Sequence, residues 1–196
     1  LRLYASLVVF DCSRNDLMSL DYLPPKLEVL ICNYNKLTAF DNLPPSLTVL
    51  RCKNNNISSL TNLPMTLKEL NCNYNNITDL SYLPYTLEAL FCAYNQLTVL
   101  GNLPQSLFLL DCAHNNLREI NHLSLKVLRC SFNSKLSIAC NSLEYLDCSF
   151  CMLSKLYNLS NTLLELNCGN DKKFDKYQIH NFGIGNVQFC EVDEYK

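Results

Sequence analysis

Cysteine and histidine are the residues in this sequence whose types and spacing could support chemistry. The 196 residues include 12 cysteines and three histidines. Cys148 and Cys151 form a C-x-x-C motif, which can bind zinc or act as a redox-active pair. Cys130 and Cys168 would complete the four thiolates of a zinc site. Three of these four cysteines also belong to a regular series, however, so only Cys151 lacks another explanation. Redox chemistry of the thioredoxin type would need a helix N-terminus at the motif. We therefore expect no metal ion and no other cofactor.

The regular series of nine cysteines defines the organisation of the chain. Each of them ends a copy of the motif L-x-x-L-x-C, and nine copies exclude a chance match. Successive copies are 20 residues apart over the first six, and then 18, 18 and 20 residues apart. The spacing predicts buried thiols that act as small hydrophobic side chains. A column of thiols would risk mispairing under oxidising conditions, so we expect a cytoplasmic location. The nine residues are Cys12, Cys32, Cys52, Cys72, Cys92, Cys112, Cys130, Cys148 and Cys168.

The motif continues as L-x-x-L-x-C-x-x-N-x-L, and over residues 1 to about 170 it resembles the leucine-rich-repeat consensus with cysteine in the third apolar position. Leu-Pro pairs such as Leu23-Pro24 and Leu103-Pro104 recur between the copies. Twenty-residue units with this pair resemble the short repeats of bacterial type III secreted effectors. Cysteine-rich forms of the pattern also resemble repeat proteins of amoebae and large DNA viruses. The ubiquitin-ligase domain that some of those effectors carry is not present in this sequence.

The repeat predicts an α/β-class leucine-rich-repeat solenoid, or horseshoe, with a parallel β-sheet on its concave face. Each motif should form a short strand that sends leucine and cysteine inward and the residue between them outward. Proline disfavours a helix in the Leu-Pro segments, and a repeat of 20 residues leaves no room for a full α-helix on that side. The convex side should therefore be mostly extended or 3₁₀, with little α-helix. An asparagine three residues after most of the cysteines, from Asn15 to Asn133, should bond to backbone groups in the turn.

The repeat also predicts where the domain parts begin and end. Residues 1–6 match the tail of a preceding repeat, residues 7–170 form about nine rungs, and residues 171–196 form a C-terminal cap with a short helix or turn and a final strand. An open solenoid end exposes an unpaired strand edge. We therefore expect the N-terminal edge to be covered by further sequence, by a partner or by a second copy of the chain.

The outward residues of the predicted strands and turns are the candidates for binding. The residue two positions after each cysteine is aromatic or histidine at six of the nine rungs. Tyrosine, phenylalanine and arginine are enriched in interfaces, but such rings also stabilise a sheet by stacking on one another without a partner. In the column before each cysteine, Asp111, Arg129 and Asp147 lie on successive rungs and predict a row of surface ion pairs. The candidate partner-binding residues are Tyr34, Arg51, Tyr74, Phe91, Tyr94, His114, Arg129, Phe132, Tyr145 and Phe150.

Composition narrows the functional class. The formal net charge is -2, from 16 basic and 18 acidic residues, which argues against nucleic-acid binding. No polybasic run or long apolar run indicates a membrane contact. His114 is the only histidine on the predicted concave face, and no outward nucleophile accompanies it. We predict a non-enzymatic protein–protein interaction module that binds a partner on the concave sheet, in the host cytosol if the chain comes from a pathogen. The alternatives are a structural protein that forms a homodimer through the concave face or the N-terminal edge, and the recognition domain of a larger enzyme.

Overall fold

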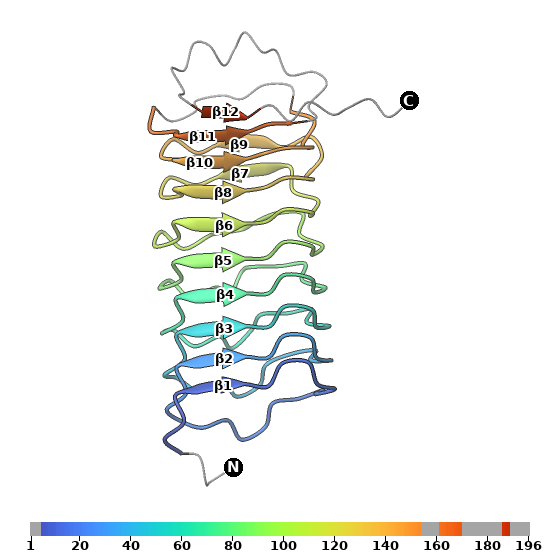
Figure 1. Ribbon diagram of the computed structural model, residues 1–196, viewed down its shortest axis with the longest axis vertical. Helices are drawn as coiled ribbons and strands as arrows, with labels where there is room; N and C mark the ends of the chain where they lie inside the picture. The colour runs from blue at the N-terminus through green and yellow to red at the C-terminus, as the bar shows by residue number, and fades with distance from the viewer. Residues whose placement is uncertain (1–4, 154–160, 170–185, 189–196) are drawn as a thin grey trace.

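The computed structural model describes residues 5–153, 161–169 and 186–188, and in this part the chain forms a curved solenoid (Figure 1). Its main feature is a ten-stranded parallel sheet, to which each repeat contributes one strand of three residues. The strands are β1 (Val9–Asp11), β2 (Val29–Ile31), β3 (Val49–Arg51), β4 (Glu69–Asn71), β5 (Ala89–Phe91), β6 (Leu109–Asp111), β8 (Val127–Arg129), β10 (Tyr145–Asp147), β11 (Glu165–Asn167) and β12 (Asn186–Gln188). The predicted leucine-rich-repeat solenoid is confirmed.

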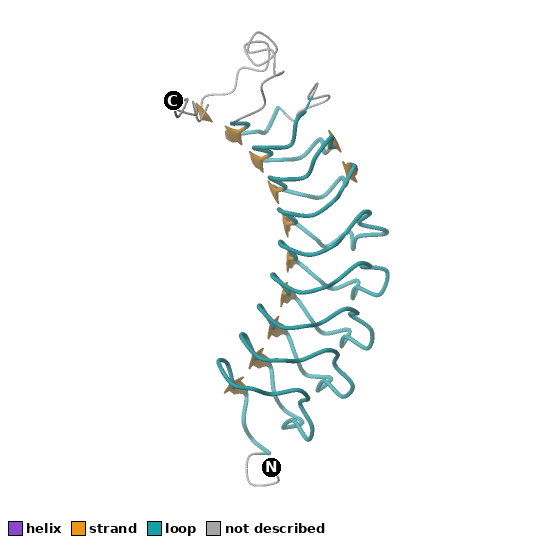
Figure 2. Ribbon diagram, turned by 90° about the vertical axis from the view of Figure 1, so that its right-hand side faces the viewer, coloured by secondary structure: helices purple, strands orange, loops and turns teal. Residues whose placement is uncertain are grey.

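The sheet lies along the concave side of the solenoid, as the side view shows (Figure 2). Neighbouring strands pair in register, so that Val29 lies beside Val49 and Leu30 beside Leu50. The middle residue of each strand points into the core, and the residues before and after it face outward. The described residues contain no helix, in agreement with the prediction of a mostly extended convex side.

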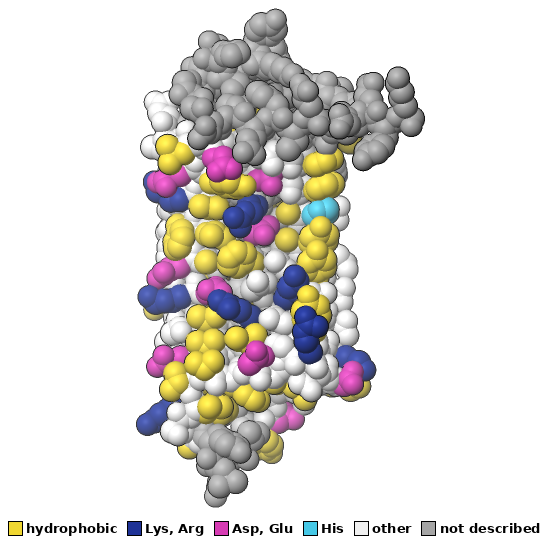
Figure 3. All heavy atoms as spheres, viewed as in Figure 1, with side chains coloured by type: hydrophobic (Ala, Val, Ile, Leu, Met, Phe, Trp, Pro, Cys, Tyr) yellow, Lys and Arg dark blue, Asp and Glu magenta, His cyan; other side chains and the backbone are white. Residues whose placement is uncertain are grey.

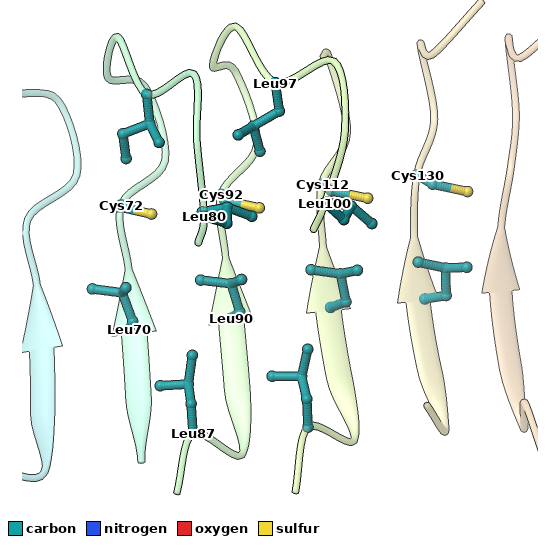
Figure 4. Packing of buried hydrophobic residues seen from close by; sticks show 14 of the residues in the cluster. Leu70, Cys72, Leu80, Leu87, Leu90, Cys92, Leu97, Leu100, Cys112 and Cys130 are labelled. Atoms are coloured by element: carbon teal, nitrogen blue, oxygen red, sulfur yellow. The ribbon is translucent and has the colours of Figure 1, made fainter. Parts of the chain in front are cut away.

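The core consists of inward columns of leucine and cysteine that run the length of the solenoid. Leu70, Leu90 and their counterparts on other rungs are fully buried, and each such side chain contributes about 1.5–3 kcal/mol through its removal from water. The sulfur atoms of Cys72, Cys92 and Cys112 lie in a line beside these leucines (Figure 4). All eleven cysteines that the structure describes are buried. The predicted thiol column is confirmed.

A ladder of asparagine side chains holds the turns that follow the strands. Asn75 illustrates the pattern: its amide nitrogen donates to the carbonyl oxygens of Cys52 and Cys72 at 3.1 and 3.0 Å. Its side-chain oxygen accepts from the backbone N–H of Ile57 at 2.9 Å. Each asparagine therefore bonds to its own rung and to the preceding one, as predicted. At the eighth rung the ladder position is Cys151, whose thiol donates to the carbonyl oxygen of Cys130 at 3.1 Å. Cys151 thus has a structural role in the turn, which accounts for the one cysteine of the C-x-x-C motif that the repeat spacing did not explain.

Hydroxyl groups form a second ladder, which the sequence analysis did not predict. The Thr66 hydroxyl donates to the carbonyl oxygens of Pro45 and Leu47 at 2.7 and 2.8 Å. Thr86 makes the same pair of bonds to Met65 and Leu67 at 2.7 and 2.9 Å. The hydroxyls thus satisfy carbonyl groups where each rung enters its strand, which a tightly stacked backbone requires.

The two 18-residue rungs carry a small second sheet on the convex side (Figure 2). Strand β7 (Glu119–Asn121) pairs in parallel with β9 (Ser137–Ala139). In the first of these rungs the Leu-Pro pair is missing and His122 is buried instead, with its Nε2 donating to the Pro104 carbonyl oxygen at 3.1 Å. The shorter convex path leaves the chain extended in both rungs, so that their backbones can pair. The sequence pattern carried no signal for this sheet.

Both ends of the chain lie mainly outside the described residues. The predicted cap, residues 171–196, is described only at β12, which pairs in parallel with β11. Residues 1–4 of the predicted repeat tail are not described. The division at residues 6 and 170 therefore stays a prediction. Within the described ranges, no helix is long and apolar enough to cross a membrane.

Candidate interaction surface on the concave side

The turn after each strand forces a side chain outward from a left-handed backbone conformation. Tyr74 has φ 56°, Tyr94 φ 55° and His114 φ 51°, and the equivalent residues of other rungs have similar values. This conformation is unfavourable for residues other than glycine. Backbone bonds between rungs hold it, since the N–H of Tyr74 donates to the Ala93 carbonyl oxygen at 2.9 Å. Because every rung repeats the same turn, these side chains leave the backbone in the same direction.

Five of these side chains form one continuous ring stack, which we call the aromatic stack. It runs through Tyr74, Tyr94, His114, Phe132 and Phe150. The ring centroids are 4.0, 3.9, 4.0 and 4.3 Å apart in that order, and the interplanar angles are 10–14°. The stack forms a column along one edge of the sheet face (Figure 3). The ring faces contact one another, so a partner would meet ring edges; the tyrosine and phenylalanine residues of the stack are about 40% exposed, and His114 is half-buried.

Cations complete this column towards the N-terminus. The Lys53 ammonium lies 5.1 Å from the centroid of the Tyr74 ring, and the Arg14 guanidinium lies 4.9 Å from that of Tyr34. Such cation–π contacts are worth roughly 0.5–1 kcal/mol at exposed sites. Asn54 occupies the ring position between Tyr34 and Tyr74, so Tyr34 is separated from the aromatic stack. The rings of this column therefore do stack on one another, which is one of the two interpretations that the sequence left open.

The imidazole at the centre of the stack is electrostatically unusual. Desolvation between the Tyr94 and Phe132 rings lowers the pKa of His114, and the nearby Asp111 carboxylate partly opposes this effect. Burial raises the pKa of Asp111 itself, and the hydrogen bond that its carboxylate accepts from the Ala113 N–H offsets only part of this increase. The neutral imidazole is thus the form that the stack favours.

Replacing His114 by phenylalanine should change how stability depends on pH. A histidine with a lowered pKa in the folded state stabilises the protein above its unfolded pKa, and this contribution is lost as the pH falls. We expect the wild-type chain to lose more stability than His114→Phe between pH 7 and 5. The ring is partly exposed, so the difference should be less than about 1 kcal/mol. Urea unfolding of both proteins at the two pH values measures it, and a larger loss in His114→Phe would contradict the assignment.

The strands carry an apolar strip beside the aromatic stack. We define the apolar strip as the outward residues Ala89, Phe91, Leu109, Val127 and Tyr145, which lie on β5, β6, β8 and β10 and are half-buried. Leu109 and Val127 are direct neighbours in the sheet register. Figure 3 shows apolar side chains in the middle of this face, with charged groups among them and along one side.

Charged residues frame the apolar strip, but they do not pair as predicted. Arg51 makes an ion pair with Glu69 at 2.8 Å. Among the described residues, no ion pair joins Arg129 to Asp111 or Asp147. The predicted row of ion pairs is therefore wrong. The Asp147 carboxylate instead accepts hydrogen bonds from the N–H and hydroxyl of Ser149 at 3.1 and 2.7 Å, and the Arg129 guanidinium lies 5.5 Å from the centroid of the Tyr145 ring.

The structure divides nine of the ten predicted binding residues into two sets. The aromatic stack brings five of them into contact, and the strands place Arg51, Phe91, Arg129 and Tyr145 on the same concave face. The tenth, Tyr34, contacts Arg14 and belongs to neither set. Leu109 and Val127 were not chosen from the sequence, although their outward register position was a signal for them. In the described part of the chain, no group of three or more histidine, cysteine or acidic residues is placed to hold a metal ion.

Comparison with known proteins supports the assignment of the fold. No protein-family model and no curated protein matches the sequence. Among solved structures, YopM from Yersinia enterocolitica WA-314 is 33% identical with a TM-score of 0.78, over 84% of this chain and 38% of that one. YopM from Yersinia pestis, a leucine-rich effector protein, is 29% identical with a TM-score of 0.79, over 84% and 48%.

A third similar structure shares the cysteine column. The functional domain of InlJ from Listeria monocytogenes, which includes a cysteine ladder, is 29% identical with a TM-score of 0.59, over 96% of this chain and 46% of that one. The chain thus spans less than half the length of each of these three structures. The repeat, the sheet and these similarities together lead to one conclusion: the chain is a leucine-rich-repeat protein with short, cysteine-rich repeats, similar to the repeats of bacterial effectors.

Proposed function

We propose that the chain is a non-enzymatic interaction module that binds a protein partner on its concave sheet. The observation that carries this proposal is the apolar strip, whose half-buried side chains face outward between charged residues and the edges of the aromatic stack. A face that contacts only water has no need for leucine, valine, phenylalanine and tyrosine in adjacent outward positions. Interfaces commonly combine such an apolar centre with a polar rim.

The two parts of the surface have different roles in this proposal. The aromatic stack is a rigid border, because its rings already hold one another at about 4 Å. The apolar strip is the contact area, because its side chains have no ring or ion-pair partner except for the Arg129–Tyr145 contact, as far as the described residues extend. The partner should therefore place an apolar surface against Phe91, Leu109 and Val127, with an acidic group near Arg129.

The similarity to Yersinia effectors and the buried thiols both support the host cytosol as the place where the chain acts. An effector acts in a host cell, and a reducing cytosol keeps a column of thiols from forming mixed disulfides. The proposed partner is accordingly a protein of the host cytosol.

The proposal is tested by the double variant Leu109→Glu/Val127→Glu. Two carboxylates in the apolar strip should weaken capture of a specific partner from host cytosol at least tenfold, because the interface would have to bury unpaired charge. The side chains are only half-buried, so the variant should still fold. Quantitative affinity capture with mass spectrometry gives the readout, and urea unfolding checks the fold.

The matched control is Met65→Glu/Leu123→Glu, which makes the same chemical change at two exposed positions outside the strands. The control should capture partners as the wild-type chain does. Equal capture by both double variants would contradict a concave binding site. Light scattering over a concentration series addresses the self-association alternative: a dimer that only Leu109→Glu/Val127→Glu dissociates would make this face a homodimer interface.

A further inference from the structure

A groove opens on the convex side, opposite the proposed binding face. It has a volume of about 320 Å³ and lies where the last of the first run of 20-residue rungs meets the first 18-residue rung. Its walls are the segments 98–103 and 118–121. The equivalent space between the first two rungs, lined by residues 18–21 and 38–43, holds only about 50 Å³. The gap at the change in repeat length is thus wider than the gap between the first two rungs, which have equal length.

One wall of the groove is the unpaired edge of β7. The N–H of Ser137 donates to the Arg118 carbonyl oxygen at 2.9 Å, so the main-chain groups of Arg118 and Ile120 point towards β9. Alternate residues of a strand point their main-chain groups to opposite edges. The N–H and carbonyl groups of Glu119 and Asn121 therefore face the groove. No backbone hydrogen bond joins them to residues 98–103, all of which the structure describes.

The other wall, residues 98–103, is apolar at its base and leaves open space above it. Leu100 is 7% exposed and Leu103 is half-buried, whereas Val99 is 63% exposed at the rim. At Gly101 an added Cβ would meet no atom within 4 Å. A chain segment in this space would thus have apolar contacts on one side and main-chain partners on the other.

We propose that this groove binds an extended peptide segment of a protein partner, which joins β7 as a third strand of the convex sheet. Two N–H and two carbonyl groups at strand spacing match another extended backbone, and addition of a strand to an open edge is a known mode of peptide recognition. Alternate side chains of the peptide would contact Leu100 and Leu103. This site lies on the convex side and is independent of the proposed concave function.

Amide hydrogen exchange of the full chain, followed by NMR, tests whether the edge is open. The amides of Glu119 and Asn121 should exchange at least a hundredfold faster than that of Ile120, which is bonded within the sheet. Comparable protection of all three amides would overturn the proposal, because the edge would then already be occupied.

Selection from a displayed library of random seven-residue peptides supplies the probe. Peptides that bind the wild-type chain should bind Val99→Arg at least tenfold more weakly, because arginine fills the rim of the groove. Ser19→Arg, at the equivalent position of the narrow groove, should bind them normally. A selected peptide should protect the Glu119 and Asn121 amides. N-methylation of the alternate peptide nitrogens that face β7 should abolish its binding, whereas N-methylation of the other nitrogens should not. Failure to select any peptide that distinguishes Val99→Arg from Ser19→Arg, or binding that survives N-methylation on both alternations, would overturn the proposal.

Discussion

Raising the pH above 9 should unfold this chain in a steep transition, because its core holds a column of protonated thiols. Burial raises the pKa of Cys72 to about 12, from 9.0 for an unperturbed thiol. Burial also raises the pKa values of Cys32, Cys52, Cys92, Cys112 and Cys130 well above 9.0. A thiolate in this apolar column would lose its hydration without gaining a counter-ion.

The direction of the effect follows from proton linkage. A group whose pKa is raised by folding binds its proton more tightly in the folded state, so its stabilisation is complete below pH 9. That contribution is lost as the pH rises from 9 towards the folded pKa. Each such thiol lowers the free energy of unfolding by about 1 kcal/mol between pH 9 and 10, and the slope approaches about 1.4 kcal/mol per pH unit above pH 10. Six thiols together remove about 6 kcal/mol between pH 9 and 10, which is comparable to the whole stability of a typical domain.

Urea unfolding under reducing conditions at pH 8, 9, 9.5 and 10, followed by circular dichroism, measures this loss. Cys72→Ala provides the control. It should be less stable at pH 8, because alanine fills less of the core, but between pH 9 and 10 it should lose about 1 kcal/mol less stability than the wild-type chain. Tyrosine and lysine titrate equally in both proteins, so the difference in slope belongs to the thiol. Parallel curves for the two proteins would contradict the assignment.

Asn75→Ala should destabilise the chain by about 3 kcal/mol, because it removes a buried side chain that bonds to two rungs. The change leaves the Ile57 N–H without its 2.9 Å acceptor and removes the donor to the carbonyls of Cys52 and Cys72. Asn75 is 7% exposed, so water cannot easily replace these bonds. The urea midpoint, compared at unchanged m-value, gives the loss.

Two companion variants test the physical reason. Asn76→Ala changes the neighbouring exposed asparagine and should cost less than about 0.5 kcal/mol. Asn75→Cys copies the natural Cys151, whose thiol donates to the Cys130 carbonyl, and should therefore cost less than Asn75→Ala. Equal losses for Asn75→Ala and Asn76→Ala would show that the ladder bonds add no net stability.

Much of the fold followed from periodicity alone. Leucine and cysteine at fixed spacing predicted the strands and the thiol column, because only a stacked arrangement buries all copies at once. The asparagine ladder followed from the need to satisfy backbone groups in a tight turn. The hydroxyl ladder of Thr66 and Thr86 was missed, because serine and threonine are common in any loop and carry no specific signal.

The candidate site was less predictable than the fold. Periodicity placed Tyr74, Tyr94 and His114 in one column, but the sequence left open whether their rings contact a partner or one another. The repeated left-handed turn decided this, because it directs every ring along the same line at stacking distance. The ion-pair row was mispredicted because Asp147 bonds to its own turn, a local competition that column position does not reveal.

The sequence by itself therefore determined the period, the inward columns and the outward register of this protein. Only the tertiary structure decided what the outward groups contact and where the rungs separate. A change from 20 to 18 residues is plain in the sequence, but its effect on the convex side depends on how two unequal arcs stack. That stacking creates β7, its open edge and the groove beside it, because main-chain groups pair only where neighbouring rungs follow the same path.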